Sequence, residues 1–211
     1  MWTNKANKLI LASASPRRLE LLKQIAVPVE QLVVPVVQSV STDGDDEPRL
    51  PGETVTDYVM RTAHDKNQRA RAYWHTTYGN HDVPILSADT TVAIDQTILG
   101  KPTDDTDAKR ILTALAGQTH DVYTAVVLST GGVDGQTHST LVHTRVTIDA
   151  VLHDCIDAYI ATGEPKGKAG AYAIQGIAAA YVTEVTGSYS SVVGLPLYET
   201  AQLLRQARLY L

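Results

Sequence analysis

Cationic, hydroxyl and acidic side chains recur at widely separated points of this 211-residue chain. Near the N-terminus, an apolar run ends in Ser13, and Arg17 and Arg18 follow directly after Pro16. Pro16 suits the first turn of a helix, and Ser15 before it suits the N-cap. Helix N–H groups, hydroxyls and guanidinium groups that face one point bind phosphate. This stretch predicts an anion site, although a solvated arginine pair on an ordinary helix would look the same.

Asp89 stands where a predominantly apolar stretch, residues 83–94, suddenly becomes polar. A carboxylate near the mouth of a sheet can hold a divalent cation or take a proton from water. Its alternative role is that of a turn former or cap. Lys101 follows within Gly100-Lys101-Pro102, a context that suits a phosphate contact, although exposed lysines are commoner.

An acidic segment offers oxygen ligands for magnesium at Asp43, Asp45, Asp46 and Glu47. It lacks the signature of a calcium loop, and a solvated loop would have the same composition. The seven histidines show no spacing typical of zinc ligands. Cys155 is the only cysteine, which excludes an intrachain disulfide and a thiolate metal cluster and fits a reducing cytoplasm.

A glycine-rich segment, residues 163–176, permits close approach of its backbone to a ligand. Its Gln175 carries both a donor and an acceptor, as recognition of a base edge requires. The segment is not a P-loop, because no Gly-Lys-Ser/Thr follows four spacer residues. Residues 187–196 have a similar character. Read alone, each segment is a loop with a tight turn.

The elements that must position these side chains alternate between strand and helix in the first half of the chain. Strands are predicted at 8–13, 29–37 and 83–94, followed by 97–99 after a short turn, and helices at 16–26, 54–74 and 104–116. In the second half the prediction is two long extended segments at 119–130 and 137–149, a helix at 152–162, a strand at 179–186, a loop at 187–195 and a helix from Pro196. This order predicts a mixed α/β sheet flanked by helices, within a single domain over residues 1–211.

One residue does not fit its predicted helix. The apolar stripe of the helix over 54–74 contains Lys66. A lysine there either extends along the surface to water, which is the usual case, or reaches into a polar site that the helix borders.

Composition limits the possible partners. The net charge of −5 argues against a general nucleic-acid coat, which needs a broad basic surface. No apolar run approaches the ~20 residues that span a bilayer, and the first residues lack a signal-peptide pattern. We therefore expect a cytoplasmic protein with no nucleic-acid or membrane partner.

Taken in order, these segments resemble the Maf family, often labelled septum formation protein. The matching segments are SASPRR, DE, PGE, YVMRTAHDK, LSADTTV, ILGKP, LAGQTHDVYTAV, TGEPKGKAGAYAIQG and GSYSSVVGLPLYET. The resemblance implies an inosine-triphosphatase-like α/β fold with two lobes around a central cleft. It also implies a nucleoside triphosphate pyrophosphatase that leaves a monophosphate. The ADTTV form resembles the branch that acts on dTTP and UTP.

The resemblance also implies roles for individual residues and a homodimer. By matching position, it assigns the proton acceptor to Asp89, base specificity to Arg17, Thr90 and Gln175, triphosphate binding to Ser13, Arg18, Lys66 and Lys101, and a divalent metal (Mg or Mn) to Glu47 and Asp89.

Two other functions stay open at this point. A pyrophosphatase for a modified purine nucleotide, such as 7-methyl-GTP or ITP, would differ only in its substrate. A non-catalytic nucleotide-binding regulator of septum formation would need the pocket but not the carboxylates Asp89 and Glu47.

Overall fold

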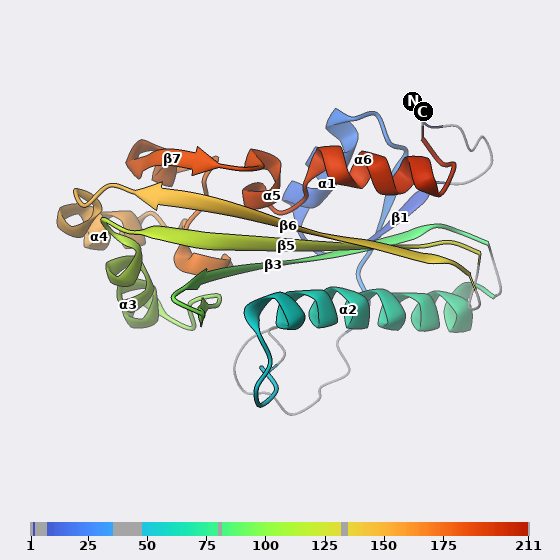
Figure 1. Cartoon of the computed structure of the whole chain (residues 1–211), viewed down its shortest axis with the longest axis horizontal. Coiled ribbons are helices and arrows are strands. Elements are labelled where there is room, and N and C mark those ends of the chain that lie inside the picture. Colours follow the sequence, from blue (N-terminus) through green and yellow to red (C-terminus); the bar gives the residue numbers. More distant parts are fainter. Residues whose placement is uncertain (1, 3–7, 36–47, 80–81, 132–134, 211) are drawn as a thin grey trace.

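A seven-stranded mixed sheet runs through the molecule in the order β2-β1-β3-β5-β6-β7, with β4 paired to β3 (Figure 1). The computed structural model describes residue 2 and residues 8–35, 48–79, 82–131 and 135–210. The elements, with η for 3₁₀ turns, are β1 (Leu9–Ala12), α1 (Pro16–Gln24), β2 (Val29–Leu32), α2 (Val55–Tyr78), β3 (Ile85–Ile94), β4 (Thr97–Leu99), α3 (Asp105–Leu115), β5 (Thr119–Ser129), β6 (Thr137–Ile148), α4 (Leu152–Ala161), η1 (Ala169–Ala171), η2 (Ile177–Tyr181), β7 (Val182–Thr186), α5 (Tyr189–Val193) and α6 (Leu197–Gln206).

Strand direction divides the sheet into two parts. β2, β1 and β3 are parallel, whereas β3, β5, β6 and β7 pair antiparallel. Crossover helices are needed only between parallel strands, and α1 and α2 fill that role. The mixed α/β sheet that the sequence predicts is confirmed.

One edge of β3 is covered only at its two ends. β1 pairs with β3 at Ile85 and Leu86, and β4 pairs with it from Val92 to Ile94. Between them, no described strand pairs with residues 87–91 on this edge. The opposite edge is paired with β5 from Ile85 to Ala93. We call residues 87–91 the open stretch of β3.

The two faces of the sheet are covered by different helices. Side chains of β3 alternate between these faces, as in any strand. On one face, Ser87 Oγ donates to the carbonyl of Ala63 in α2 at 2.9 Å. On the other, Leu86 and Ala88 pack in one cluster with residues of α1 and α6, including Leu22. Figure 1 shows α2 on one side of the strands and α1 and α6 on the other.

The helix ends follow local hydrogen bonding. α1 begins at Pro16, as predicted. α2 begins after Thr54, whose side chain accepts the N–H of Asp57 at 3.1 Å. It continues one turn beyond the predicted end at Trp74, where that ring contacts the ring of Tyr78. No helix among the described residues combines the length and apolar character that a bilayer crossing needs.

Two predictions near the C-terminus are wrong in detail. The expected loop at 187–195 contains the short helix α5, because the Ser188 hydroxyl caps it by accepting the N–H of Ser191. The expected strand at 179–186 begins only at Val182, since residues 177–181 form a 3₁₀ turn. The carboxylate of Glu164 accepts the N–H groups of Ile177 and Ala178 and so holds that turn away from the sheet ladder.

A buried pair fastens the glycine-rich segment to the sheet. His120 in β5 is 1% exposed, and its Nε2 lies 2.9 Å from the hydroxyl of Tyr172. The Nδ1 atom of His120 has no hydrogen-bond partner among the described residues. Burial lowers the pKa of His120 to about 4 from 6.5, because the cationic form would be poorly solvated.

We expect His120 to make folding stability sensitive to acid. Above pH 6.5 the His120 ring is neutral in both the folded and the unfolded chain. Between pH 6.5 and about 4, the ring is protonated in the unfolded chain but stays neutral in the folded one. The free energy of unfolding should therefore fall by up to about 3 kcal/mol more in the wild type than in His120→Gln over this range. Urea unfolding at several pH values measures the difference. Parallel pH profiles for the two proteins would contradict it.

Candidate active site

Arg18 reaches from α1 to the open stretch of β3. Its Nε donates to the carbonyl of Gly194 at 2.8 Å, and its Nη1 donates to Ser13 Oγ at 3.2 Å. Its Nη2 donates to Thr90 Oγ1 at 3.2 Å, and this hydroxyl lies 3.0 Å from Thr124 Oγ1 in β5. The guanidinium is thus fixed between the end of β1, the sheet and the turn after α5.

Among the described residues, Arg18 donates to neutral oxygens and makes no direct ion pair. Burial lowers the pKa of Arg18, the nearby Asp89 carboxylate opposes this, and the neighbouring Arg17 lowers the pKa further. Burial also lowers the pKa of Arg17. Two partly desolvated guanidinium groups side by side favour an incoming anion.

Asp89 and Lys66 meet on the α2 face of the open stretch. Lys66 Nζ donates to Asp89 Oδ1 at 2.5 Å, and the Thr91 hydroxyl donates to Oδ2 at 3.2 Å. The side chain of Asp89 is only 10% exposed and that of Lys66 28%. The sequence left two interpretations of Lys66, extension to water or reach into a polar site. The structure shows the latter, because its Nζ contacts Asp89.

The open stretch brings the two groups of polar residues to one edge of the sheet. Asp89 and Thr90 are neighbours in β3 and point to opposite faces, toward Lys66 and Arg18 respectively. No described strand pairs with the edge between these two groups. Leu99 at the end of β4 pairs with Val92, just beyond the open stretch. Lys101 follows two residues later, so the backbone of Lys101 approaches the same edge.

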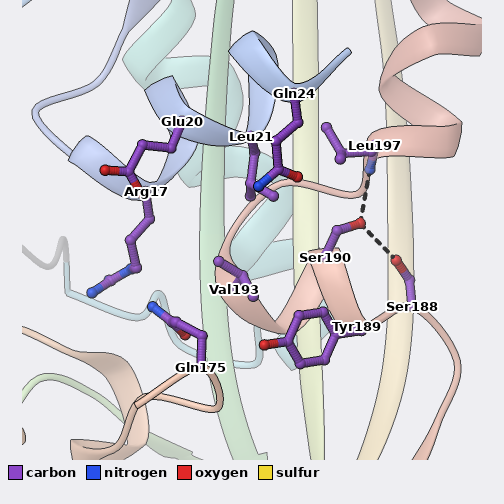
Figure 2. Close-up of a pocket in the computed structure, with 10 residues that line it drawn as sticks. All are labelled: Arg17, Glu20, Leu21, Gln24, Gln175, Ser188, Tyr189, Ser190, Val193 and Leu197. Atoms are coloured by element: carbon purple, nitrogen blue, oxygen red, sulfur yellow. Dashed lines mark hydrogen bonds between the residues drawn. The ribbon is translucent and has the colours of Figure 1, made fainter.

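A hollow of about 510 Å³ lies next to Arg18, between α1 and α5. Figure 2 shows the side chains that line it: Arg17, Glu20, Leu21, Gln24, Gln175, Ser188, Tyr189, Ser190, Val193 and Leu197. The structure thus brings Arg17 and Gln175 together from distant motifs. Thr90, which the resemblance grouped with them, does not line this hollow, and its hydroxyl accepts a hydrogen bond from Arg18.

The segment that carries Gln175 is held by Glu164, a residue that the sequence analysis did not single out. Its carboxylate accepts the hydroxyl of Tyr159 at 2.7 Å and the N–H groups of Ile177 and Ala178 at 2.9 and 3.1 Å. Burial raises the pKa of Glu164, but these hydrogen bonds outweigh it and the pKa lies below its usual value. Gly176 leaves the necessary room, since a Cβ there would lie 2.2 Å from Glu164 Oε2.

Lys168 is a second residue that sequence reasoning missed. Its Nζ donates to the backbone carbonyl of Glu164 at 2.5 Å. Burial lowers the pKa of Lys168, Arg17 lowers it further, and Glu164 raises it. Arg17 is therefore close to cations on both sides, Arg18 and Lys168. The sequence held a basic signal in KGKAG but nothing to separate Lys168 from Lys166.

The residues expected to hold a metal are described only in part. Asp89 supplies carboxylate oxygens, the donor type that Mg²⁺ and Mn²⁺ prefer, at a partly buried position. Within the described ranges, no group of three or more His, Cys, Asp or Glu side chains comes together. Glu47, the second expected ligand, lies outside the described residues together with Asp43, Asp45 and Asp46. Asp89 thus fits a divalent cation, which would need further donors.

We expect Glu164→Gln to loosen the segment that carries Gln175. An amide has a single acceptor oxygen where the carboxylate has two, so one of the hydrogen bonds from Tyr159, Ile177 and Ala178 is lost. The free energy of unfolding should drop by about 1–3 kcal/mol, and the amides of 177 and 178 should exchange hydrogen faster. Glu184→Gln is the matched control, because the carboxylate of that exposed glutamate accepts, within the described part of the chain, only the nearby Thr186 hydroxyl. Equal stability of the two variants would refute the role of Glu164.

This chain is similar in sequence to named proteins over almost its whole length. A dTTP/UTP pyrophosphatase of Bordetella parapertussis is 50% identical over 200 residues, covering 95% of this chain and 92% of that protein. One of Nitrosomonas europaea is 48% identical over 208 residues, covering 98% and 97%. A solved HAM1 protein from Coxiella burnetii has a TM-score of 0.41 and 15% identity, covering 68% of this chain and 74% of that one. The family model described as Maf-like protein matches residues 8–207, and the chain therefore belongs to the Maf family.

Proposed function

We propose that this chain is a nucleoside triphosphate pyrophosphatase that hydrolyses dTTP and UTP to the monophosphate and pyrophosphate. The observation that carries the proposal is the meeting of two groups at one open sheet edge: Arg18 with Ser13 and Thr90, and Asp89 with Lys66. The substrate class rests on relatives of 48–50% identity that are named dTTP/UTP pyrophosphatase. We further propose that it acts in the cytoplasm, as a single-domain chain that forms a homodimer.

In this proposal the triphosphate lies along the open stretch of β3. Arg18 binds phosphate oxygens from one face, and its three hydrogen bonds to neutral oxygens keep it oriented before substrate arrives. Lys66 and Lys101 add positive charge from α2 and from the end of β4. Fixed cations of this kind stabilise the charge that develops in phosphoryl transfer, and a single arginine can contribute ~10³-fold or more.

Asp89 acts as the proton acceptor in the proposed reaction. The oxygen of a water molecule bonds to the α-phosphorus, its proton passes to the Asp89 carboxylate, and the bond from the α-phosphorus to the bridging oxygen breaks. Pyrophosphate leaves with that oxygen. The Thr91 hydroxyl holds one carboxylate oxygen of Asp89, and Lys66 holds the other before substrate binds.

A divalent cation, Mg²⁺ or Mn²⁺, held by Asp89 and Glu47 would supply positive charge against the triphosphate. Lys66 now occupies one oxygen of Asp89, at 2.5 Å. Its long, flexible side chain can transfer this hydrogen bond to a phosphate oxygen, which would free the carboxylate for its other partners.

A nucleotide panel with pyrophosphate detection tests the function. We expect turnover of dTTP and UTP in Mg²⁺ or Mn²⁺, with the monophosphate and pyrophosphate as products, and loss of turnover when a chelator removes the metal. Faster cleavage of 7-methyl-GTP or ITP would favour the modified-purine enzyme instead. Nucleotide that stays bound and uncleaved in Mg²⁺ would favour a non-catalytic regulator.

We expect Asp89→Asn to lower kcat by about 10²- to 10⁴-fold, because an amide cannot accept the proton from water. The variant should keep its circular dichroism spectrum. Asp157→Asn is the control, since Asp157 pairs with Lys109 on the exposed side of α4 and should leave kcat unchanged. An Asp89→Asn variant with near-normal turnover would exclude Asp89 as the base.

A further inference from the structure

We propose that the ring of Tyr189, in the hollow where Arg17 and Gln175 are expected to contact the base, is the surface on which the pyrimidine stacks. This inference rests on the proposed function, because it takes the triphosphate to lie along the open stretch of β3. It adds Tyr189 as a residue that holds the base.

The Tyr189 ring is displayed in the hollow rather than packed in the core. Tyr189 is 52% exposed, although burial of a tyrosine ring is favourable. Among the described residues it makes no contact with another aromatic ring. Figure 2 shows the ring at one end of the hollow, with its hydroxyl on the side where Gln175 lies. An uncovered ring at the wall of a pocket is available to a flat ligand.

The backbone on both sides of Tyr189 is fixed. The N–H of Ser188 donates to Thr144 Oγ1 in β6 at 3.0 Å, and the hydroxyl of Ser188 caps α5. On the other side, the Ser190 hydroxyl accepts the N–H of Leu197 at 3.0 Å, a bond visible in Figure 2. The ring is therefore carried by a rigid segment, which lowers the entropy cost of stacking a base on it.

The charge of the hollow suits a base better than a phosphate. It is lined by one cation, Arg17, and one anion, Glu20, so formal charges balance. The remaining lining is neutral: two amides, two serine hydroxyls, Tyr189 and three aliphatic side chains. A triphosphate would be repelled by Glu20, whereas an uncharged pyrimidine would not. The apolar part, with Leu21 6% exposed, can cover the faces of a ring.

The hollow and the phosphate site adjoin, as a nucleotide requires. Arg17 and Val193 line the hollow, and their chain neighbours Arg18 and Gly194 are joined by the 2.8 Å hydrogen bond at the phosphate site. Gln175 also faces the hollow, and its amide can pair with the imide edge that thymine and uracil share. Stacking holds either base without distinguishing them, and the amide supplies the polar contact.

The test compares Tyr189→Ala with Tyr189→Phe and with Tyr198→Ala. Loss of the stack should raise KM for dTTP and UTP about 5- to 100-fold with little change in kcat. The Phe variant keeps the ring and should stay within about twofold of the wild type. Tyr198 is 69% exposed and does not line the hollow, so its removal should leave KM unchanged. Inorganic tripolyphosphate, which has no base, should inhibit the wild type and Tyr189→Ala equally.

Two results would overturn the inference while the proposed function stands. One is an active Tyr189→Ala enzyme with an unchanged KM. The other is a Tyr189→Ala enzyme that loses inhibition by tripolyphosphate together with its affinity for dTTP and UTP, which would mean that the substitution disturbs the phosphate site. Equilibrium binding of dTMP gives a readout without turnover: if the wild type cleaves no nucleotide but binds dTMP through Tyr189, only the proposed function fails. If it binds no nucleotide, both fail.

Discussion

The site depends on an interruption in strand pairing along β3. A sheet edge normally gains stability from a continuous neighbour, and here β1 stops at Ala12 while β4 pairs only from Val92 onward. The opposite edge of β3 is paired with β5 along almost its whole length, so the open stretch is held rigidly from one side. Alternation along the strand then points Asp89 and Thr90 to opposite faces. A ligand at this edge meets side chains that a complete sheet would keep apart.

Arg18 and Lys168 are held by neutral groups, whereas Lys66 pairs with the carboxylate of Asp89. Arg18 is bound by a carbonyl and two hydroxyls, and Lys168 by backbone carbonyls. Burial lowers the pKa of both side chains, and the proximity of Arg17 lowers each further. This arrangement orients the cations but leaves their charge largely uncompensated. The free energy cost of crowding them is offset when a polyanion binds, which is why such a cluster favours a triphosphate.

Local sequence patterns predicted most strands and helices, because apolar periodicity and capping residues act over a few positions. The position of Lys66 in an apolar stripe was likewise a readable local conflict, and the ion pair with Asp89 explains it. Residues whose role comes from long-range contacts could not be found this way. Glu164 looks like an ordinary surface glutamate, yet its carboxylate binds Tyr159, Ile177 and Ala178.

The short helix α5 also depends on long-range contacts that local sequence patterns do not reveal. It lies between the surroundings of Arg18 and the hollow. Five residues are too few for a helix to be stable alone, so α5 depends on its surroundings. The Thr124 hydroxyl of β5 donates to the Ser191 carbonyl, Thr144 of β6 accepts the N–H of Ser188, and Arg18 of α1 binds the carbonyl of Gly194. The arginine that we propose binds phosphate therefore also helps to fix the helix that carries Tyr189. If a nucleotide binds as proposed, this hydrogen bond connects the residues around its phosphates with the wall of the neighbouring hollow, so one connected framework would recognise both halves of the nucleotide.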